Sequence, residues 1–257
     1  MNCVLITGAS GGIGLEFARI FAKEKNNLFL VARNKDKLEE VKRELEAEGK
    51  EVFILSADLT REEEVDRVFA FAVENGLNIE TLVNNAGFGD FGEYASCNYE
   101  KQRDMVNLNV LALMKLTHMF LPAMKEKGCG EILNVASIAS FQPGPLMSVY
   151  YASKAFVLSF SEALYSELKK SGVKVCALCP GPIKTGFEKA ANLDNSGLFK
   201  NMKVATAAQV ARFGYKKLKK GKAVAIYGSS NRFLIFASRF APRSMVRKVV
   251  HKIMKVR

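Results

Sequence analysis

The sequence predicts one α/β domain, built on a doubly wound, parallel, seven-stranded sheet flanked by helices. Two observations carry this prediction. Seven short apolar runs alternate with longer amphipathic segments at the spacing of βαβ units, and a glycine-rich turn follows the first run. The 257 residues are 49% hydrophobic, enough for one large core, and contain no linker or low-complexity tract. We expect this domain to occupy residues 1–230, followed by a basic amphipathic extension over 231–257.

The expected strands are the seven apolar runs, in order CVLI, NLFLVA, EVFILSA, TLVNNA, GEILNVAS, VKVCALC and AVAIY. Between them, residues 34–49 have the pattern of an amphipathic helix that ends at Gly49. Residues 60–76 form another, which Thr60 and Glu63 are expected to begin as a capping box. Because parallel strands are joined by right-handed crossovers, we expect helices on both faces of the sheet.

Two further helices, over 105–121 and 150–164, are apolar nearly all round. A helix that covers one sheet face normally keeps a polar outer stripe, so these two are expected to be buried on both sides. Either the C-terminal segment folds over them, or they form a subunit interface. The second alternative is favoured and predicts a homodimer or a homotetramer.

The glycine-rich turn VLITGASGGIG lies between the first strand and the first helix. In that context Gly8 permits the tight turn, Gly12 lets backbone N–H groups approach a pyrophosphate, and Gly14 allows close helix packing. At the end of the second strand, Ala32 stands where an acid would bind the ribose 2′-hydroxyl of NAD, and Arg33 follows it. The guanidinium could pair with a 2′-phosphate, so NADP is the expected cofactor.

The stretch SVYYASKA, residues 148–155, places two tyrosines one helical turn before a lysine. Reduction of a carbonyl needs a proton donor, and a tyrosine qualifies when a nearby cation stabilises its phenolate. Tyr150 is at i−4 from Lys154 and Tyr151 is at i−3, so local spacing does not choose between them.

Together, the segments TGASGGIG, NNAG at 84–87, Ser137, Tyr-x-x-x-Lys and PGPIKT at 180–185 resemble the short-chain dehydrogenase/reductase family, NADP-preferring carbonyl reductase type. The likeness covers about residues 3–228 and implies a Rossmann fold. It assigns the proton donor and acceptor role to Tyr150, support of the phenolate to Lys154, and orientation of the substrate oxygen to Ser137. The fourth catalytic member is an asparagine, and counting back from Thr117 selects Asn109 over Asn107.

The resemblance also implies the cofactor contacts. Asp58 and Leu59 would flank the adenine, although Asp58 could instead help to cap the next helix. The implied cofactor-binding residues are Gly8, Ser10, Gly12, Ile13, Gly14, Arg33, Asp58, Leu59, Asn85, Ala86, Gly87, Tyr150, Lys154, Pro180, Gly181, Ile183 and Thr185.

The excess of positive over negative charge lies at the end of the chain. The net charge is +12, Asp194 is the last acidic residue, and 16 Lys or Arg follow it. From Arg243 onward, apolar residues recur at helical spacing with basic residues between them. Two alternatives are equally weighted: this helix binds an anionic membrane surface, or it packs on the oligomer. Nucleic acid is disfavoured as a partner, because no recognised fold or stacking platform accompanies the charge.

Five cysteines, an odd and scattered set, do not suggest a disulfide framework. Cys176 and Cys179 lie within one strand, where alternation would direct them to opposite faces, so neither a metal site nor a redox site is expected. With a strand-like start and no apolar run of about 20 residues, the protein is expected to be cytoplasmic, with peripheral membrane contact as an option through the tail.

These observations predict an NADP(H)-dependent oxidoreductase that transfers a hydride between nicotinamide and a carbonyl or secondary alcohol. The resemblance implies that the segment 186–204 covers the substrate. Because large apolar side chains occur in it, the substrate is expected to be lipophilic, a steroid, fatty-acyl or similar ketone. The alternative is a non-catalytic NADP-binding redox sensor, or a membrane-recruited interaction protein with the same fold. A sensor could dispense with the proton donor, so the presence of all four catalytic residues favours the enzyme.

Overall fold

The computed structural model describes residues 1–47, 49–184, 186, 191–192 and 204–255. Its centre is a seven-stranded sheet in the order β3-β2-β1-β4-β5-β6-β9, in which every neighbouring pair is parallel. The predicted doubly wound α/β fold with seven strands is therefore confirmed. The strands are β1 Asn2–Thr7, β2 Asn27–Ala32, β3 Val52–Ser56, β4 Asn78–Asn84, β5 Gly130–Val135, β6 Val173–Cys179 and β9 Val224–Ile226.

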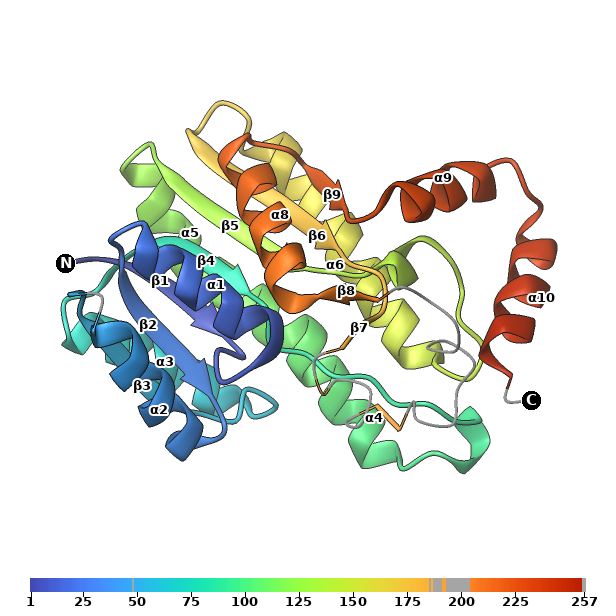
Figure 1. Ribbon diagram of the computed structural model, residues 1–257, viewed down its shortest axis with the longest axis horizontal. Coiled ribbons are helices and arrows are strands. Elements are labelled where there is room, and N and C mark those ends of the chain that lie inside the picture. The colour runs from blue at the N-terminus through green and yellow to red at the C-terminus, as the bar shows by residue number, and fades with distance from the viewer. Residues whose placement is uncertain (48, 185, 187–190, 193–203, 256–257) are drawn as a thin grey trace.

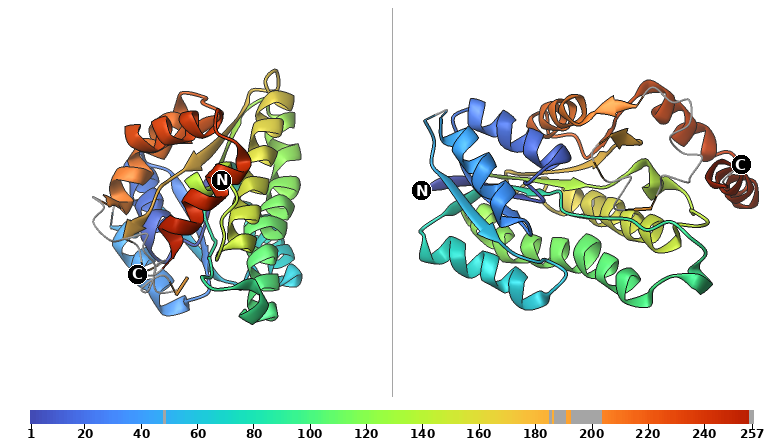
Figure 2. Two further views of the ribbon diagram at one scale, coloured as in Figure 1. Left: turned by 90° about the vertical axis from the view of Figure 1, so that its right-hand side faces the viewer. Right: turned by 60° about the horizontal axis from the view of Figure 1, so that its bottom comes forward.

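Helices cover both faces of this sheet, as Figures 1 and 2 show. One face packs against α1 (Gly12–Lys23), α2 (Lys35–Glu46) and α8 (Ala207–Lys219). The other packs against α3 (Glu62–Glu74), α5 (Leu113–Glu126) and α6 (Ser148–Glu167). Because the sheet is buried on both sides, its strands are continuous apolar runs rather than alternating ones.

Shorter elements lie mainly at the carboxyl edge of the sheet. They are the 3₁₀ helices η1 (Tyr94–Ser96) and η3 (Ile138–Phe141), helix α4 (Tyr99–Val106), and the small parallel sheet of β7 (Ile183–Lys184) and β8 (Ala205–Thr206). Two C-terminal helices, α9 (Ser229–Ser238) and α10 (Arg243–Met254), lie beyond the same edge (Figure 1). No helix among the described residues is long and apolar enough to cross a membrane.

The start of α3 differs from the prediction. The helix begins at Glu62 after Arg61, with no side-chain cap, so the expected Thr60–Glu63 capping box is wrong. Instead, Asp58 Oδ1 accepts hydrogen bonds from the Thr60 N–H at 3.2 Å and from the Thr60 hydroxyl at 2.9 Å. The Thr60 hydroxyl is thus used within a turn that precedes the helix.

The predicted helix over 105–121 is part of a longer helical segment that changes type. Helix α4 runs into a π-helical stretch, η2 (Asn107–Ala112), and α5 follows it directly. Within this segment Leu111 and Met114 are exposed, and so is Phe156 on α6. Within one copy of the chain these outer side chains are uncovered. The described part of the C-terminal segment packs against α6 near its start, where Val250 and Met254 meet Tyr151.

The two thiols of the C-x-x-C stretch do lie on opposite faces of β6. Cys176 belongs to the core beneath α1 and α8, whereas Cys179 packs in a cluster with Val157 of α6. Among the described residues, no group of three or more His, Cys, Asp or Glu side chains could hold a metal ion.

Candidate active site

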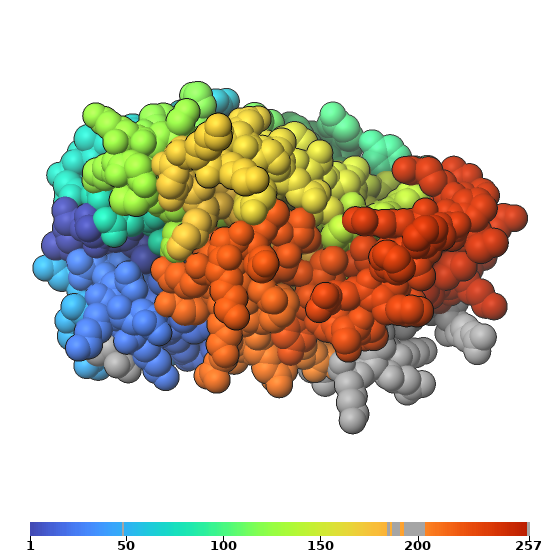
Figure 3. All heavy atoms as spheres, turned by 90° about the horizontal axis from the view of Figure 1, so that it is seen from above, coloured from blue at the N-terminus to red at the C-terminus, as the bar shows by residue number. Residues whose placement is uncertain are grey.

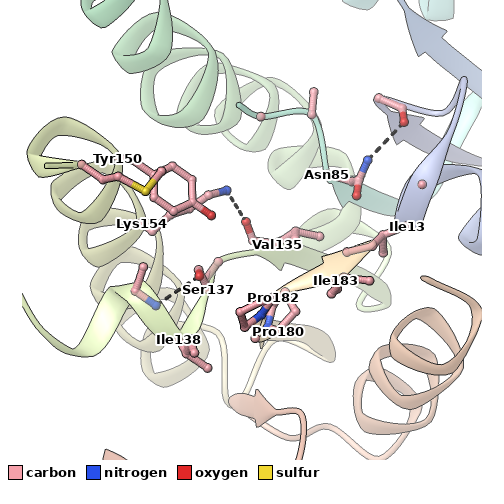
Figure 4. Close-up of a pocket in the computed structure, with 18 of the residues that line it drawn as sticks. Ile13, Asn85, Val135, Ser137, Ile138, Tyr150, Lys154, Pro180, Pro182 and Ile183 are labelled. Carbon is pink, nitrogen blue, oxygen red and sulfur yellow. Dashed lines mark hydrogen bonds between the residues drawn. The ribbon is translucent and has the colours of Figure 1, made fainter. Parts of the chain in front are cut away.

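A cavity of about 320 Å³ lies at the carboxyl ends of the central strands, the edge at which open α/β sheets bind ligands. Its walls come from the turn after β1, the segment after β4, the end of β5, the start of α6 and the segment after β6. Figure 4 shows Tyr150, Lys154 and Ser137 on one side of this cavity, with Ile13 and Asn85 on the other. A single cavity thus joins the glycine turn to the predicted catalytic residues.

The glycine turn has the backbone geometry that the sequence predicted. Gly8 has φ +66°, and a Cβ there would lie 2.8 Å from Asn85 Nδ2. A Cβ at Gly14 would lie 2.3 Å from the Gly8 carbonyl oxygen, so α1 can approach β1 this closely only without a side chain. At Gly11, which lines the cavity, a Cβ would meet no protein atom within 4 Å.

The segment after β4 is bonded directly to this turn. The Thr7 hydroxyl oxygen accepts hydrogen bonds from the N–H groups of Asn85 and Ala86, both at 3.0 Å. The Asn85 amide donates back to the carbonyl oxygens of Thr7 at 2.9 Å and Gly8 at 3.2 Å. Asn85 therefore fixes the turn from the neighbouring strand, with its side chain engaged by protein backbone.

Arg33 follows β2 directly and is exposed, and the preceding residue, Ala32, has no carboxylate. Its carbonyl oxygen accepts a hydrogen bond from the Ser56 hydroxyl at 2.9 Å, which ties the ends of β2 and β3 together. Asp58 is engaged with Thr60, and Leu59 is buried in the core. None of these three positions lines the cavity.

Ser137 is oriented by the short helix η3 that it begins. Its hydroxyl oxygen accepts a hydrogen bond from the Ala139 N–H at 3.1 Å. The Ser140 hydroxyl accepts from the Ser137 N–H at 3.3 Å and donates to the Lys154 carbonyl oxygen at 2.7 Å. The end of β5 is thereby fastened to the turn of α6 that carries Lys154.

The two tyrosines have different surroundings, although both line the cavity. Burial raises the pKa of Tyr150 to about 12, and hydrogen bonding with Ser137 partly opposes this rise. Burial also raises the pKa of Tyr151 to about 12, and its hydroxyl lies 3.9 Å from Met254 Sδ of α10. Tyr150 alone of the pair is therefore engaged with Ser137.

Lys154 is buried, and its ammonium donates a hydrogen bond to the Val135 carbonyl oxygen at 2.7 Å. Its Nζ lies 6.0 Å from the centre of the Tyr150 ring. Burial lowers the pKa of Lys154 to about 8. The sequence predicts that this cation lowers the pKa of Tyr150. The direction is instead upward, because the loss of hydration on burial outweighs the other contributions.

Asn109 lies in the π-helical stretch η2, is 1% exposed, and does not line the cavity. Its amide donates to the Phe88 carbonyl oxygen and to the Ser153 hydroxyl, both at 3.0 Å, and its oxygen accepts from the Phe88 N–H at 3.1 Å. A Cβ at Gly87 would lie 2.8 Å from this oxygen and 3.3 Å from Lys154 Nζ. Asn109 thus joins the segment after β4 to α6, directly behind Lys154.

Most of the predicted site residues meet in the cavity. Those that line it are Gly8, Gly12, Ile13, Asn85, Ala86, Gly87, Ser137, Tyr150, Lys154, Pro180, Gly181 and Ile183. Those described elsewhere are Ser10, Gly14, Arg33, Asp58, Leu59 and Asn109. Thr185, and the apolar residues Phe187, Leu193, Leu198, Phe199 and Met202 of the predicted covering segment, lie outside the described residues.

Sequence reasoning missed several residues of the wall. Gly11, Val135, Ala136, Ile138, Ala139 and Met147 also line the cavity, whereas the lining residues Pro182 and Gly186 lie within the segments 180–185 and 186–204 that the resemblance implied. Val135 acts through its backbone carbonyl, which leaves no signal in a side-chain pattern. Ile138 and Ala139 follow Ser137 directly, so their proximity to it could have suggested them.

These residues fit a nicotinamide dinucleotide. Gly11 and Gly12 line the cavity where α1 begins, and a Cβ at Gly11 would meet no protein atom, which suits a pyrophosphate at a helix N-terminus. The cavity then continues from that turn to Lys154 and Tyr150, where the nicotinamide end would lie.

Comparison with known proteins gives consistent results. A sequence model of the short chain dehydrogenase family matches residues 2–196. The very-long-chain 3-oxoacyl-CoA reductase of Anas platyrhynchos is 38% identical over 191 residues, which are 72% of this chain and 61% of that protein. The ketoacyl reductase HetN of Nostoc sp. is 34% identical over 185 residues, 72% of this chain and 64% of that protein. The chain thus spans less than two thirds of the length of these two relatives.

A solved structure agrees over nearly the whole chain. The short-chain dehydrogenase from Sphingobium yanoikuyae in complex with NADPH superimposes with a TM-score of 0.83 at 32% identity, covering 93% of this chain and 94% of that one. With this fold, this cavity and a family match over most of its length, the chain belongs to the short-chain dehydrogenase family.

Proposed function

We propose that the chain is an NADP(H)-dependent reductase of a lipophilic ketone, of the 3-oxoacyl thioester class, with Tyr150 as its proton donor. The observation that carries this proposal is that Tyr150, Ser137 and Lys154 converge on one cavity, which continues to the glycine turn. A reduced nicotinamide supplies a hydride when it is bound there. The chain's own residues must then hold the carbonyl and deliver a proton to its oxygen.

Tyr150 and Ser137 suit those two tasks. The Ser137 hydroxyl is oriented by η3 and can donate a hydrogen bond to the carbonyl oxygen, while the Tyr150 O–H gives that oxygen its proton. The buried Lys154 ammonium stabilises the phenolate that remains after the proton has left. Reduction thus leaves a secondary alcohol, with its new O–H proton taken from Tyr150.

The substrate class rests on the apolar wall and on the relatives. Ile138, Ala139 and Met147 line the end of the cavity that holds Tyr150, and Tyr151 packs beside them. The two curated relatives described above are named as reductases of ketoacyl and very-long-chain 3-oxoacyl-CoA substrates. An acyl chain is the lipophilic part that such a wall would hold.

The test is consumption of NADPH with 3-oxoacyl-CoA substrates of increasing chain length. Tyr150→Phe should lower turnover at least about a hundredfold, because the general acid is lost, while NADPH binding survives. Tyr151→Phe is the matched control, one residue away in the same cavity, and should retain turnover. If Tyr151→Phe were the inactive variant, the assignment would be refuted. Bound NADPH that no 3-oxoacyl, steroid or other lipophilic ketone oxidises would favour the redox sensor.

The preference for NADP rests on Arg33, which is exposed at the end of β2 where no carboxylate competes. Arg33→Ala should weaken NADPH binding by about 1.5–3 kcal/mol, the scale of a hydrogen bond to a charged group, and leave NADH binding little changed. Arg43→Ala, an exposed arginine farther along α2, is the control. Equal affinity of the unmodified protein for NADPH and NADH would contradict the preference.

We also propose that the chain forms a homodimer or homotetramer through the helical layer of α4, η2, α5 and α6. Val106, Leu111, Met114 and Phe156 are exposed along this layer, and Phe156 stacks on Phe160 at 5.7 Å. Exposed large apolar side chains on adjacent helices support a self-complementary interface.

A further inference from the structure

The two C-terminal helices expose more large apolar side chains than any comparable part of the chain that the structure describes. We call this surface the α9–α10 patch. Its residues are Phe233, Leu234, Phe236, Phe240, Met245, Val249 and Ile253, each between 52% and 77% exposed. They are seven of the fifteen exposed large hydrophobic residues in the described ranges. Figures 1 and 3 show α9 and α10 at one end of the molecule, beyond the carboxyl edge of the sheet.

Helix α10 has two apolar stripes rather than one. The inner stripe, Val246, Val250 and Met254, packs in a cluster with Met147 and Tyr151. The outer stripe, Met245, Val249 and Ile253, repeats at the same spacing one residue earlier and is exposed. Packing onto the domain therefore explains only the inner stripe.

Helix α9 is even less buried. Ile235 is its only buried residue, while the exposed Phe236 forms an edge-to-face pair at 5.3 Å with the exposed Phe240, which follows the helix. Aromatic side chains of this size are costly to leave in water at about 25 cal/mol per Å² of apolar surface. The patch therefore has the character of a surface that is covered during function.

The charges around the patch identify what covers it. Seven exposed basic residues surround it: Arg232, Arg239, Arg243, Arg247, Lys248, Lys252 and Lys255. No acidic residue occurs anywhere after Asp194. A second copy of this chain would bring seven positive charges against the same seven, with no carboxylate from either patch to pair them. An anionic lipid surface can bind both kinds of side chain. Its acyl chains take up the aromatic residues, and its phosphate groups pair with the basic residues.

We propose that the α9–α10 patch docks on an anionic lipid bilayer surface. Helix α10 would lie in the interface, with Met245, Val249 and Ile253 inserted and Lys248 and Lys252 at the level of the headgroups. The sequence pattern of α10 alone is equally consistent with packing on the oligomer. The structure separates the two functions on one helix, because the inner stripe contacts the domain and the outer stripe remains exposed.

Both helices are also anchored to the wall of the cavity. Met254 contacts the hydroxyl of Tyr151, which lines it. A Cβ at the cavity-lining Gly181 would lie 2.8 Å from the Asn231 amide nitrogen of α9. Docking would thus place this end of the cavity at the bilayer, so that a lipophilic ketone reaches Tyr150 from the membrane. This second part rests on the proposed function, whereas the docking itself does not.

The test is sedimentation of the full chain with vesicles of phosphatidylcholine alone and of phosphatidylcholine mixed with phosphatidylglycerol. Binding should be strong to the anionic vesicles, far weaker to the neutral ones, and reduced by salt. The triple variant Phe233→Ser/Phe236→Ser/Phe240→Ser should bind anionic vesicles at least about tenfold more weakly, since these side chains are exposed and their loss should not disturb the fold. The matched control is Tyr94→Ser/Tyr99→Ser, which removes two exposed aromatic residues elsewhere.

A charge variant tests the second component. Lys248→Gln/Lys252→Gln should lower binding by about tenfold and flatten its salt dependence, whereas Lys125→Gln/Lys127→Gln on α5 and the turn after it should change neither. Equal vesicle binding by the unmodified protein and the triple variant would overturn the proposal. The proposal would also be overturned if the unmodified protein did not bind vesicles and the triple variant no longer formed an oligomer or no longer co-purified with another protein. The patch would then bind a protein surface.

Activity separates this proposal from the proposed function. The triple variant should reduce a short, water-soluble ketone at the unmodified rate and should lose activity only toward a ketone embedded in anionic vesicles. An unmodified protein that binds vesicles and reduces no ketone would leave the docking supported and refute the reductase. An unmodified protein that reduces soluble ketones and does not bind vesicles would support the reductase and refute the docking.

Discussion

Replacing Asn109 with alanine should destabilise the protein and disorder the site behind Lys154. The buried amide makes three hydrogen bonds, to the N–H and carbonyl of Phe88 and to the Ser153 hydroxyl. Ser153 keeps its bond to the Tyr150 carbonyl oxygen, so the two groups of Phe88 carry most of the loss. Because Phe88 is half-buried, each of its two unpaired groups should cost an amount in the lower part of the range of about 1–3 kcal/mol, so we expect a total loss of about 2–4 kcal/mol.

For a chain of this length, that loss corresponds to a drop in melting temperature of roughly 4–16 °C, which thermal denaturation followed by circular dichroism would measure. Asn107→Ala is the matched control, because this half-buried neighbour in the same π-helical stretch takes no part in the bonds to Phe88 and Ser153. Its melting temperature should change by no more than about 2 °C. If both variants melted alike, or if Asn107→Ala were the less stable, the structural role given to Asn109 would be refuted.

Three further outcomes follow from the site and the helical layer. Lys154→Met should stabilise the fold by about 1–3 kcal/mol at pH 7, because burial of the charged ammonium lowers its pKa from an ordinary 10.5 to about 8. The cost of burying that charge is complete below pH 8 and disappears as the pH rises to 10.5, so the stabilisation should disappear with it. An equal increase in melting temperature at pH 7 and at pH 10.5 would contradict this prediction. Gly14→Ala should abolish cofactor binding measured by titration, since its Cβ would strike the Gly8 carbonyl oxygen, whereas Gly11→Ala should fold normally because its Cβ meets no protein atom. Leu111→Glu should convert the proposed oligomer into monomers by light scattering, and an unchanged mass would exclude this layer as the interface.

The strands and the cavity were predictable because they depend on local patterns. Buried parallel strands are continuous apolar runs, and parallel strands bring their carboxyl ends to one edge, so residues far apart in sequence could be assigned to one site. The Gly8 and Gly14 positions were predictable for a similar reason, since only glycine satisfies their close contacts with Asn85 and with each other.

The errors concern competition between neighbouring groups. The Thr60 cap failed because Asp58, two residues earlier, binds the same hydroxyl. Asn109 lies in the π-helical stretch, and its side chain is bonded to Phe88 and Ser153, which come from distant parts of the chain. The direction of the Tyr150 pKa depends on burial, which no motif reports.

The pairing of β6 with β9 determines how late in synthesis the edge of the sheet at β6 is covered and protected from aggregation. Strand β6 is apolar on both faces, and Ala177, Leu178 and Cys179 are completely buried where they pair with Val224–Ile226. Until the ribosome has released those last three strand residues, the nascent sheet ends in an open hydrophobic edge, which is a template for intermolecular pairing. Any nonsense mutation or proteolytic cut before residue 224 would leave that edge permanently uncovered, even though most of the cavity wall would already have been synthesised.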